Sequence, residues 1–186
     1  MAIPRGGVVI GDVIAASLGA KLDIKVSRKI GAPTNPELAI GAVTHDGSFS
    51  PNEEVIRMVN VPQEHIDEQI LVQEKEIQRR LRIFRGGKQY TLINKIVILV
   101  DDGIATGATM IAAIRWLSSQ RPKSLMVAVP VAPRDTVDKL KEEKEVDEVI
   151  VLYLPLAFSA VGAFYQDFSQ VSDEEVIEIM RRYQYK

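Results

Sequence analysis

The chain has 186 residues, of which 46% are hydrophobic, and a formal net charge of −2. This length suffices for one substantial core, so we expect residues 1–186 to form a single domain. The near-neutral charge gives no overall attraction to nucleic acid or to anionic lipid, so any basic site must be local. The sequence has no cysteine, which excludes disulfides, thiolate catalysis and cysteine-ligated metals.

The first twenty residues superficially match a secretory signal, because a basic residue precedes an apolar stretch. Asp12 and the Gly6-Gly7 doublet interrupt that stretch. We therefore predict an amphipathic helix over Val8–Leu18, closed by Gly19. No segment has the apolar length that a membrane helix needs, so we expect a cytoplasmic protein without a membrane partner.

Strand and helix patterns then alternate along the chain. The predicted elements, in order, are a strand at Leu22–Ser27, an extended segment at Leu38–Val43, a short helix from Ser50-Pro51 to about Val59, a charged helix at Gln63–Phe84, a strand at 95–101, a helix at Ala108–Ser119, a strand at Leu125–Val131, a helix at Thr136–Glu143, a strand at Val149–Leu154 and a last helix with a capping box at Ser172–Glu175. This alternation predicts an α/β fold in which helices flank a mostly parallel sheet. Ligands of such sheets bind at the carboxyl ends of the strands.

Residues 97–109 combine several groups that suit a sugar phosphate. Four apolar residues end in Asp101 and Asp102, and the loop Ala105-Thr106-Gly107-Ala108-Thr109 then opens onto a helix. Backbone N–H groups and the positive end of a helix dipole suit a phosphate dianion, and the threonine hydroxyls add donors. Ionised carboxylates accept hydrogen bonds from ribose hydroxyls. Acid pairs at strand ends also occur in receiver domains and magnesium sites, so the pattern alone leaves those alternatives open.

Val97–Thr109 resembles the phosphoribosyl pyrophosphate signature of the type I phosphoribosyltransferase family: four apolar residues, an acidic pair, a short linker and Thr-Gly-x-Thr. The resemblance extends to Pro4-Arg5-Gly6-Gly7, to Val26–Val43 and to the tail Phe158–Gln170. These segments are similar to a subgroup of predicted phosphoribosyltransferases whose substrate the resemblance does not supply. Gly103 departs from the family pattern, which usually has an aliphatic residue there.

The resemblance implies transfer of ribose 5-phosphate between phosphoribosyl pyrophosphate, or a nucleotide, and a nitrogenous base. In such an enzyme Ala105–Thr109 would bind the 5-phosphate. Asp101 and Asp102 would be catalytic, holding the ribose hydroxyls and favouring positive charge on the sugar. Arg5, Gly6 and Gly7 would take the pyrophosphate, in a loop that often contains a cis non-proline peptide. Mg²⁺ is the implied cofactor, reached by the acidic pair mainly through water and substrate.

Only Met1-Ala2-Ile3 precede Pro4, whereas the resemblance implies a full strand ahead of this loop. That strand would neighbour the one that ends at Asp101, so its loss would expose ladder groups inside the sheet. Either this sequence begins late, or a shortened strand and neighbouring chains cover these groups.

Two further segments bring basic residues. Arg28 and Lys29 follow a predicted strand, so they either reach the pyrophosphate or form a solvated basic pair. Residues 44–93 stand where the resemblance implies a mobile loop, and we expect this largely helical insert to be a lid. Arg85, which adjoins Gly86 and Gly87, is our preferred substrate contact in the insert. A solvated helix face balanced by Glu74 and Glu76 accounts for most of the remaining insert arginines, namely Arg79, Arg80 and Arg82.

The acceptor base is the least defined part of this interpretation. Enzymes acting on 6-oxopurines usually have an acid at the position of Ala105 and a lysine at that of Ala108, which disfavours hypoxanthine and guanine. Adenine-like, pyrimidine and unfamiliar acceptors stay open. Aromatic residues of the tail 154–186 form either a hood against a flat base or a satellite core cluster: Phe158, Phe164 and Tyr165.

Two other functions stay open at this point. The same fold could bind its ligand without turnover and regulate a partner, and a homodimer is allowed in either case. A receiver-like phosphoacceptor would need an acceptor aspartate at another strand end, and Ser27-Arg28 and Val131-Ala132 offer none. His45 and His65 are predicted to be surface residues rather than metal ligands.

Overall fold

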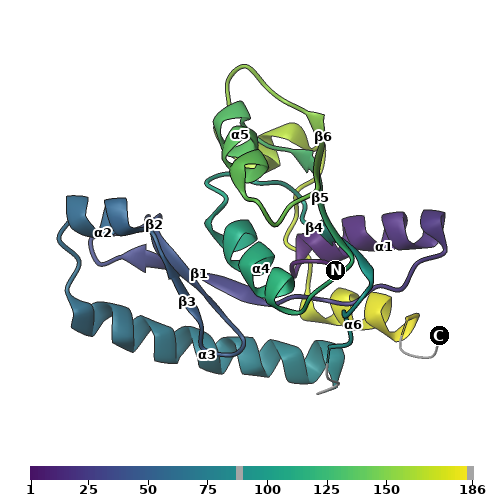
Figure 1. Cartoon of the computed structure of the whole chain (residues 1–186), viewed down its shortest axis with the longest axis horizontal. Helices are drawn as coiled ribbons and strands as arrows, with labels where there is room; N and C mark the ends of the chain where they lie inside the picture. Colours follow the sequence, from purple (N-terminus) through teal and green to yellow (C-terminus); the bar gives the residue numbers. More distant parts are fainter. Residues whose placement is uncertain (87–89, 184–186) are drawn as a thin grey trace.

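A parallel sheet forms the centre of the molecule in the computed structural model, which describes residues 1–86 and 90–183. Its order is β4 (Ile96–Val100), β5 (Ser124–Val131) and β6 (Glu148–Tyr153). Helices α4 (Ala108–Ser119) and α5 (Arg134–Glu142) lie on one side of this sheet, and α1 (Gly6–Leu18) lies on the other (Figure 1). The predicted α/β class is confirmed.

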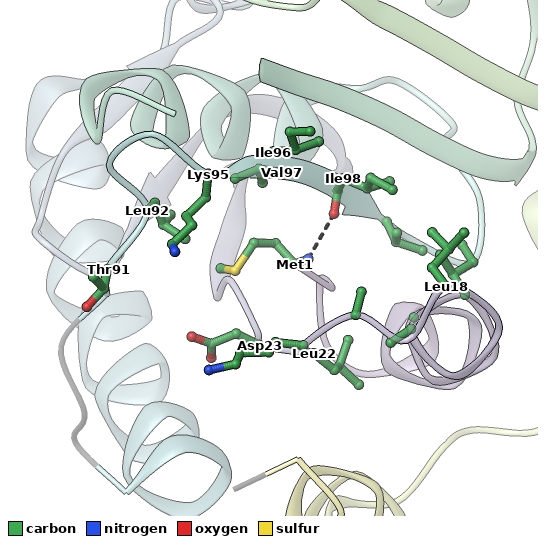
Figure 2. Close-up of a pocket in the computed structure, with 16 residues that line it drawn as sticks. Met1, Leu18, Leu22, Asp23, Thr91, Leu92, Lys95, Ile96, Val97 and Ile98 are labelled. Carbon is green, nitrogen blue, oxygen red and sulfur yellow. Dashed lines mark hydrogen bonds between the residues drawn. The ribbon is translucent and has the colours of Figure 1, made fainter. Parts of the chain in front are cut away.

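The first three residues act as a short strand of this sheet. Ala2 bridges in parallel to Ile24 on one side and to Val100 on the other. The Ile3 amide donates to the Val100 oxygen at 2.9 Å, and the Met1 amino group donates to the Ile98 oxygen at 2.8 Å (Figure 2). The predicted shortened strand is therefore present, and it pairs with neighbours within this chain.

A second, antiparallel sheet holds β1 (Ser27–Ala32), β2 (Asn35–Thr44) and β3 (Phe49–Pro51) in that order. Two predictions are wrong here. The strand expected at Leu22–Ser27 divides, because Ile24 pairs with Ala2 while β1 begins only at Ser27. The helix expected from Ser50-Pro51 begins later, since Ser50 pairs with Ala42 and the Asn52 side chain caps α2 (Glu53–Met58).

The long helix of the insert packs beside the antiparallel sheet and beside the last helix of the chain. Helix α3 (Gln63–Arg85) packs against β1, β2 and α6 (Asp173–Arg181), and Figure 1 shows α6 beside its end. The predicted capping box is confirmed, because Ser172 and Glu175 exchange side-chain and backbone bonds at the start of α6. A 3₁₀ turn, η1 (Val161–Phe164), lies in the tail before it. No helix among the described residues is long and apolar enough to cross a membrane.

A polar and aromatic cluster joins α4 to the β2–β3 turn. The fully buried Lys25 places Nζ 2.8 Å from His45 Nδ1 and 3.7 Å from the centroid of the Trp116 ring. The His45 ring also meets the edges of Trp116 and Tyr90. Burial lowers the pKa of Lys25 to about 7 and that of His45 to about 4. The predicted surface position of His45 is wrong, since its ring is half-buried. His65 is also half-buried, with Nε2 3.0 Å from the Gly31 oxygen.

Replacing Lys25 with methionine is expected to change how stability depends on pH. Between pH 7 and 10.5 the unfolded chain holds a proton at Lys25 that the folded chain does not, so the free energy of unfolding rises with pH in this range. Lys25→Met removes this rise and raises the free energy of unfolding at neutral pH by about 1–2 kcal/mol. Urea unfolding at about pH 7 and pH 9, followed by the fluorescence of Trp116, measures both effects. Equal pH slopes in the two proteins would contradict the assignment.

Candidate functional site

The acidic pair at the end of β4 lies against the glycine loop at the start of α1. A Cβ on Gly6 would lie 1.8 Å from Asp102 Oδ2, and one on Gly7 would lie 2.8 Å from the Asp101 Cα. Only glycine permits this approach, because any side chain would displace the carboxylates. The cis non-proline peptide that the resemblance implies is present between Pro4 and Arg5. Two motifs far apart in the sequence are thus brought into direct contact.

The loop Ala105–Thr109 presents backbone donors beside this pair. The Ile104 amide before the loop bonds to a protein oxygen, and the next backbone amide that does so is that of Ile111. The Ile111 amide donates to the Gly107 oxygen at 2.8 Å. Residues 105–110 therefore keep their N–H groups available at the start of α4. Gly107 takes a left-handed φ of 82°, which turns the chain into the helix, and Ala105 and Thr106 are exposed. The geometry suits an anion bound at a helix N-terminus.

Three contacts fix this loop from behind. The Thr136 hydroxyl donates to the Ala105 oxygen at 2.7 Å, and the Ile104 amide donates to the Val131 oxygen at 3.0 Å. The Ser27 hydroxyl donates to the Thr109 oxygen at 3.3 Å. Sequence reasoning missed Thr136 and Ser27, although each is a hydroxyl residue close to the carboxyl end of a predicted strand. Both act by positioning the loop, because their partners are its carbonyl groups.

The carboxylates of Asp101 and Asp102 lie close together in a partly enclosed environment. Burial, and then the charge of Asp102, hold the pKa of Asp101 well above its ordinary value. Burial likewise raises the pKa of Asp102. The Asp102 amide donates to Asp101 Oδ1 at 2.9 Å, which fixes the first carboxylate. Groups so placed gain from hydrogen-bond donors and from positive charge brought by a ligand.

A cavity of about 360 Å³ lies between α1 and the tail, and Asp102 is the member of the acidic pair that lines it. Arg5, Asp102 and Tyr165 line it, and the Tyr165 hydroxyl donates to the Asp102 backbone oxygen at 2.5 Å. Of the three aromatic residues expected in a hood, only Tyr165 lines this cavity, together with Phe168, which is 5.1 Å away between ring centroids. Phe158 and Phe164 instead stack on each other, so the tail supplies both a wall and a small apolar cluster.

The glycine that departs from the family pattern has a packing reason. A Cβ on Gly103 would lie 2.5 Å from Val161 Cγ1 and 3.0 Å from Val131 Cγ1. The tail turn η1 therefore sits directly on the loop after the acidic pair. An aliphatic residue at this position would push the tail away from the site.

The basic pair after the first strand separates into two roles. Arg28 is half-buried, and its Nε donates to Gln73 Oε1 of α3 at 2.9 Å. Burial lowers the pKa of Arg28, and the nearby charges of Arg80, Arg5 and Arg79 lower it further. Lys29 pairs with the exposed Glu37 across the hairpin at 2.8 Å, as expected when neighbouring strand residues alternate. The structure thus places Arg28 against α3, whereas Lys29 stays on the hairpin.

Arg85 is part of the core rather than of this site. It is 8% exposed, donates from Nε to Asp23 Oδ1 at 2.6 Å and lies over the Tyr90 ring. The choice of Arg85 as a substrate contact is therefore withdrawn. Gly87, which was part of that choice, lies outside the described residues. Arg79 is exposed and pairs with Glu76 as expected, and it also reaches Asp173 near Arg5.

A larger cavity lies elsewhere. It has a volume of about 650 Å³ and runs beside the Met1 bridge, between the segment around Leu22 and β4, with α1 as a wall (Figure 2). Its lining is mainly apolar, with Ile14, Leu18 and Ile96 as examples. It contains neither the glycine loop nor the acidic pair, so the smaller cavity is the candidate site.

Comparisons with known proteins agree with this geometry. Residues 1–167 match the family model described as "Phosphoribosyl transferase domain". Two Mycobacterium tuberculosis proteins, from strains CDC 1551 and H37Rv, carry a provisional phosphoribosyl transferase name and are each 40% identical over 183 residues. These alignments cover 98% of this chain but only 41% of each relative. The crystal structure of TT1426 from Thermus thermophilus superposes with a TM-score of 0.79 and 38% identity, covering 98% of this chain and 86% of that one.

Asp101→Asn is expected to stabilise the protein near pH 7. The folded chain binds a proton at Asp101 more tightly than the unfolded chain does, so this group's contribution to stability falls as pH rises above its ordinary value of 3.8. An amide avoids that loss, and we expect a gain of about 1 kcal/mol or more. Thermal unfolding at pH 5 and pH 8 measures it.

Asp147→Asn is the matched control. The Ser124 hydroxyl and the Leu125 amide donate to Asp147 Oδ2 at 2.7 and 2.8 Å, and these bonds lower the pKa of that carboxyl. Its amide variant should therefore unfold at a lower temperature, or at the same one. A loss of stability in Asp101→Asn equal to that of the control would show that the acidic pair is not under electrostatic stress.

Proposed function

Because the chain belongs to the phosphoribosyl transferase domain family, we propose that it transfers ribose 5-phosphate between phosphoribosyl pyrophosphate and a nitrogenous base, with release of pyrophosphate. The observation that carries this proposal is the contact of Gly6 and Gly7 with Asp101 and Asp102, beside a loop with free amides. Each part of the ligand is then assigned to one group of residues. The 5-phosphate binds at Ala105–Thr109, the ribose binds at the acidic pair, and the pyrophosphate binds at Arg5. The chain spans 41% of the curated relatives it matches, so this proposal concerns the domain described here.

The acidic pair provides the catalytic groups of this proposal. Asp101 and Asp102 accept hydrogen bonds from ribose hydroxyls, which add to the bond that the Asp102 amide already donates to Asp101. As the bond from the anomeric carbon to pyrophosphate breaks, the ring gains positive charge that nearby carboxylates stabilise. The lone pair of a ring nitrogen of the base then forms the new bond from the opposite face, and the proton of that nitrogen passes to water or to the released pyrophosphate. The electron pair of the broken bond leaves with pyrophosphate, whose charge Arg5 meets.

Mg²⁺ is the cofactor we propose for this reaction. Asp101 and Asp102 supply hard oxygen donors, and two carboxylates fit an ion that is shared with substrate oxygens and water. Among residues 1–86 and 90–183, no group of three or more His, Cys, Asp or Glu side chains could hold a metal alone. When bound with the ligand, the ion would neutralise charge on the leaving pyrophosphate.

The acceptor base is assigned to the cavity of about 360 Å³ beside the pair. Tyr165 and Phe168 present aromatic surface there, and stacking is worth about 1–3 kcal/mol per base. The insert 44–93 acts as the lid in this proposal, and the tail 154–186 as the hood. A flat heterocycle is the acceptor class that such walls favour.

Calorimetric titration with phosphoribosyl pyrophosphate and Mg²⁺ tests the assigned places. Thr106→Val, and Asp101→Asn combined with Asp102→Asn, should each weaken binding at least tenfold, since a hydrogen bond to a charged group contributes about 1.5–3 kcal/mol. Thr91→Val, which removes a hydroxyl from the lining of the larger cavity, is the matched control and should bind normally. Unchanged affinity in the folded site variants would refute the assigned cavity.

A mass-spectrometric screen of pooled bases then tests turnover. A nucleotide product that requires both phosphoribosyl pyrophosphate and Mg²⁺ would establish the reaction and its acceptor together. Tight binding without any product across purines, pyrimidines and other heterocycles would instead support a ligand sensor with the same fold.

A further inference from the structure

An acidic side chain joins the glycine loop to the insert helix. Asp173, at the first position of α6, places Oδ1 3.4 Å from Arg5 Nη1. Its Oδ2 lies 3.0 Å from both Nη atoms of Arg79 on α3. Arg5 also lines the cavity beside Asp102. The carboxylate of Asp173 therefore occupies the position between two guanidinium groups, at the margin of the candidate site.

A second carboxylate continues this arrangement along α3. Glu76 Oε2 lies 2.8 Å from Arg79 Nε, and its Oε1 lies 2.7 Å from Arg80 Nε. These bonds lower the pKa of Glu76 to about 2, so it stays ionised. Arg80 is the more enclosed of the two arginines, since its side chain is 13% exposed whereas that of Arg79 is 48% exposed.

Arg28 brings a further positive charge with a neutral partner. Its Nε bonds to Gln73, and it lies close enough to Arg80, Arg5 and Arg79 for their charges to lower its pKa. Four guanidinium groups thus gather around two carboxylates. We call these four residues the arginine cluster: Arg5, Arg28, Arg79 and Arg80.

The arginine cluster differs from the buried arginine of the core. Arg85 has its own carboxylate, because two of its nitrogens bond to the two Asp23 oxygens at 2.6 and 2.7 Å. The arginine cluster keeps an excess of positive charge in a half-buried place, and like charges this close repel. Guanidinium forks match phosphate oxygens and can bind them in pairs, so a diphosphate group suits this excess.

We propose that Arg28, Arg79 and Arg80 complete the pyrophosphate site that Arg5 begins, and that Asp173 competes with the diphosphate for Arg5 and Arg79. The proposal rests on the proposed function, because the diphosphate belongs to the same ligand. A phosphate group that replaces the Asp173 carboxylate binds Arg5 and Arg79 together. It thereby links the lid helix α3 to the glycine loop and releases the start of α6.

Titration with inorganic pyrophosphate at fixed Mg²⁺ tests this inference without the ribose. Arg80→Gln should lower the affinity about tenfold or more, because it removes a charged hydrogen-bond donor. Arg80→Lys should recover part of that loss, since it keeps the charge but not the fork. Asp173→Asn should raise the affinity several-fold, because the competing charge is gone. Arg82→Gln is the matched control on the same helix and should bind as the unchanged protein does.

Each result that differs from these expectations would overturn one part of the proposal. Normal pyrophosphate binding by a folded Arg80→Gln variant would remove α3 from the site. Weaker binding by Asp173→Asn would make Asp173 a structural residue instead of a competitor. Thr106→Val should weaken binding of phosphoribosyl pyrophosphate, because it removes a donor to the 5-phosphate, while inorganic pyrophosphate, which has no 5-phosphate, binds as before. If phosphoribosyl pyrophosphate binds no better than pyrophosphate, the proposed function fails while the arginine cluster stands.

Discussion

The close approach of a glycine backbone to two carboxylates is the constraint on which the site depends. Gly6 and Gly7 lie so near Asp101 and Asp102 that no Cβ fits between them. Residues 1–3 pair with β4 through Ala2 and Val100. This pairing fixes the approach, because it places the glycine loop beside the carboxyl end of β4. The sheet core is therefore also what positions the candidate chemistry. Burial of the pair raises the pKa of both carboxylates, so the site is held at some cost to stability.

The sequence alone predicted the strand and the helix that carry the candidate acidic pair and loop. The strand, acidic pair and loop of residues 97–109 predict a helix start, and α4 begins at Ala108 as expected. The glycine loop was predicted as a separate anion site. Its direct contact with the acidic pair was not predicted, because the spacing of two distant segments carries no distance information. Thr136 and Ser27 were missed for the same reason, since their partners are backbone oxygens of a distant loop.

The roles predicted for Arg85 and Arg80 in the insert were wrong, because they were inferred from the neighbouring residues in the sequence and not from the face of the helix. Arg85 was preferred because it adjoins a glycine pair, yet it lies eight positions after Ile77 and one after Phe84, both fully buried. Helical spacing places it on the buried face, where Asp23 can neutralise it. Arg80 was assigned to a solvated face because Glu76 lies one turn before it. That ion pair is real, but the same helix face also meets Arg28 of β1, which no local pattern encodes.

The tail and the insert meet through the ion pairs of Asp173 as well as through a shared apolar cluster that contains Ile77 of α3 and Val176 of α6. Asp173 lies in the first turn of α6, so a negative charge there is favourable to the helix as well as to Arg5 and Arg79. A ligand that takes over these arginines leaves the helix with Glu174 and Glu175 in its first turn, which preserves the dipole interaction and the capping box. Exchange of one carboxylate for one phosphate group is thus inexpensive for α6. In the proposed exchange, the tail would therefore respond to the ligand without unfolding α6.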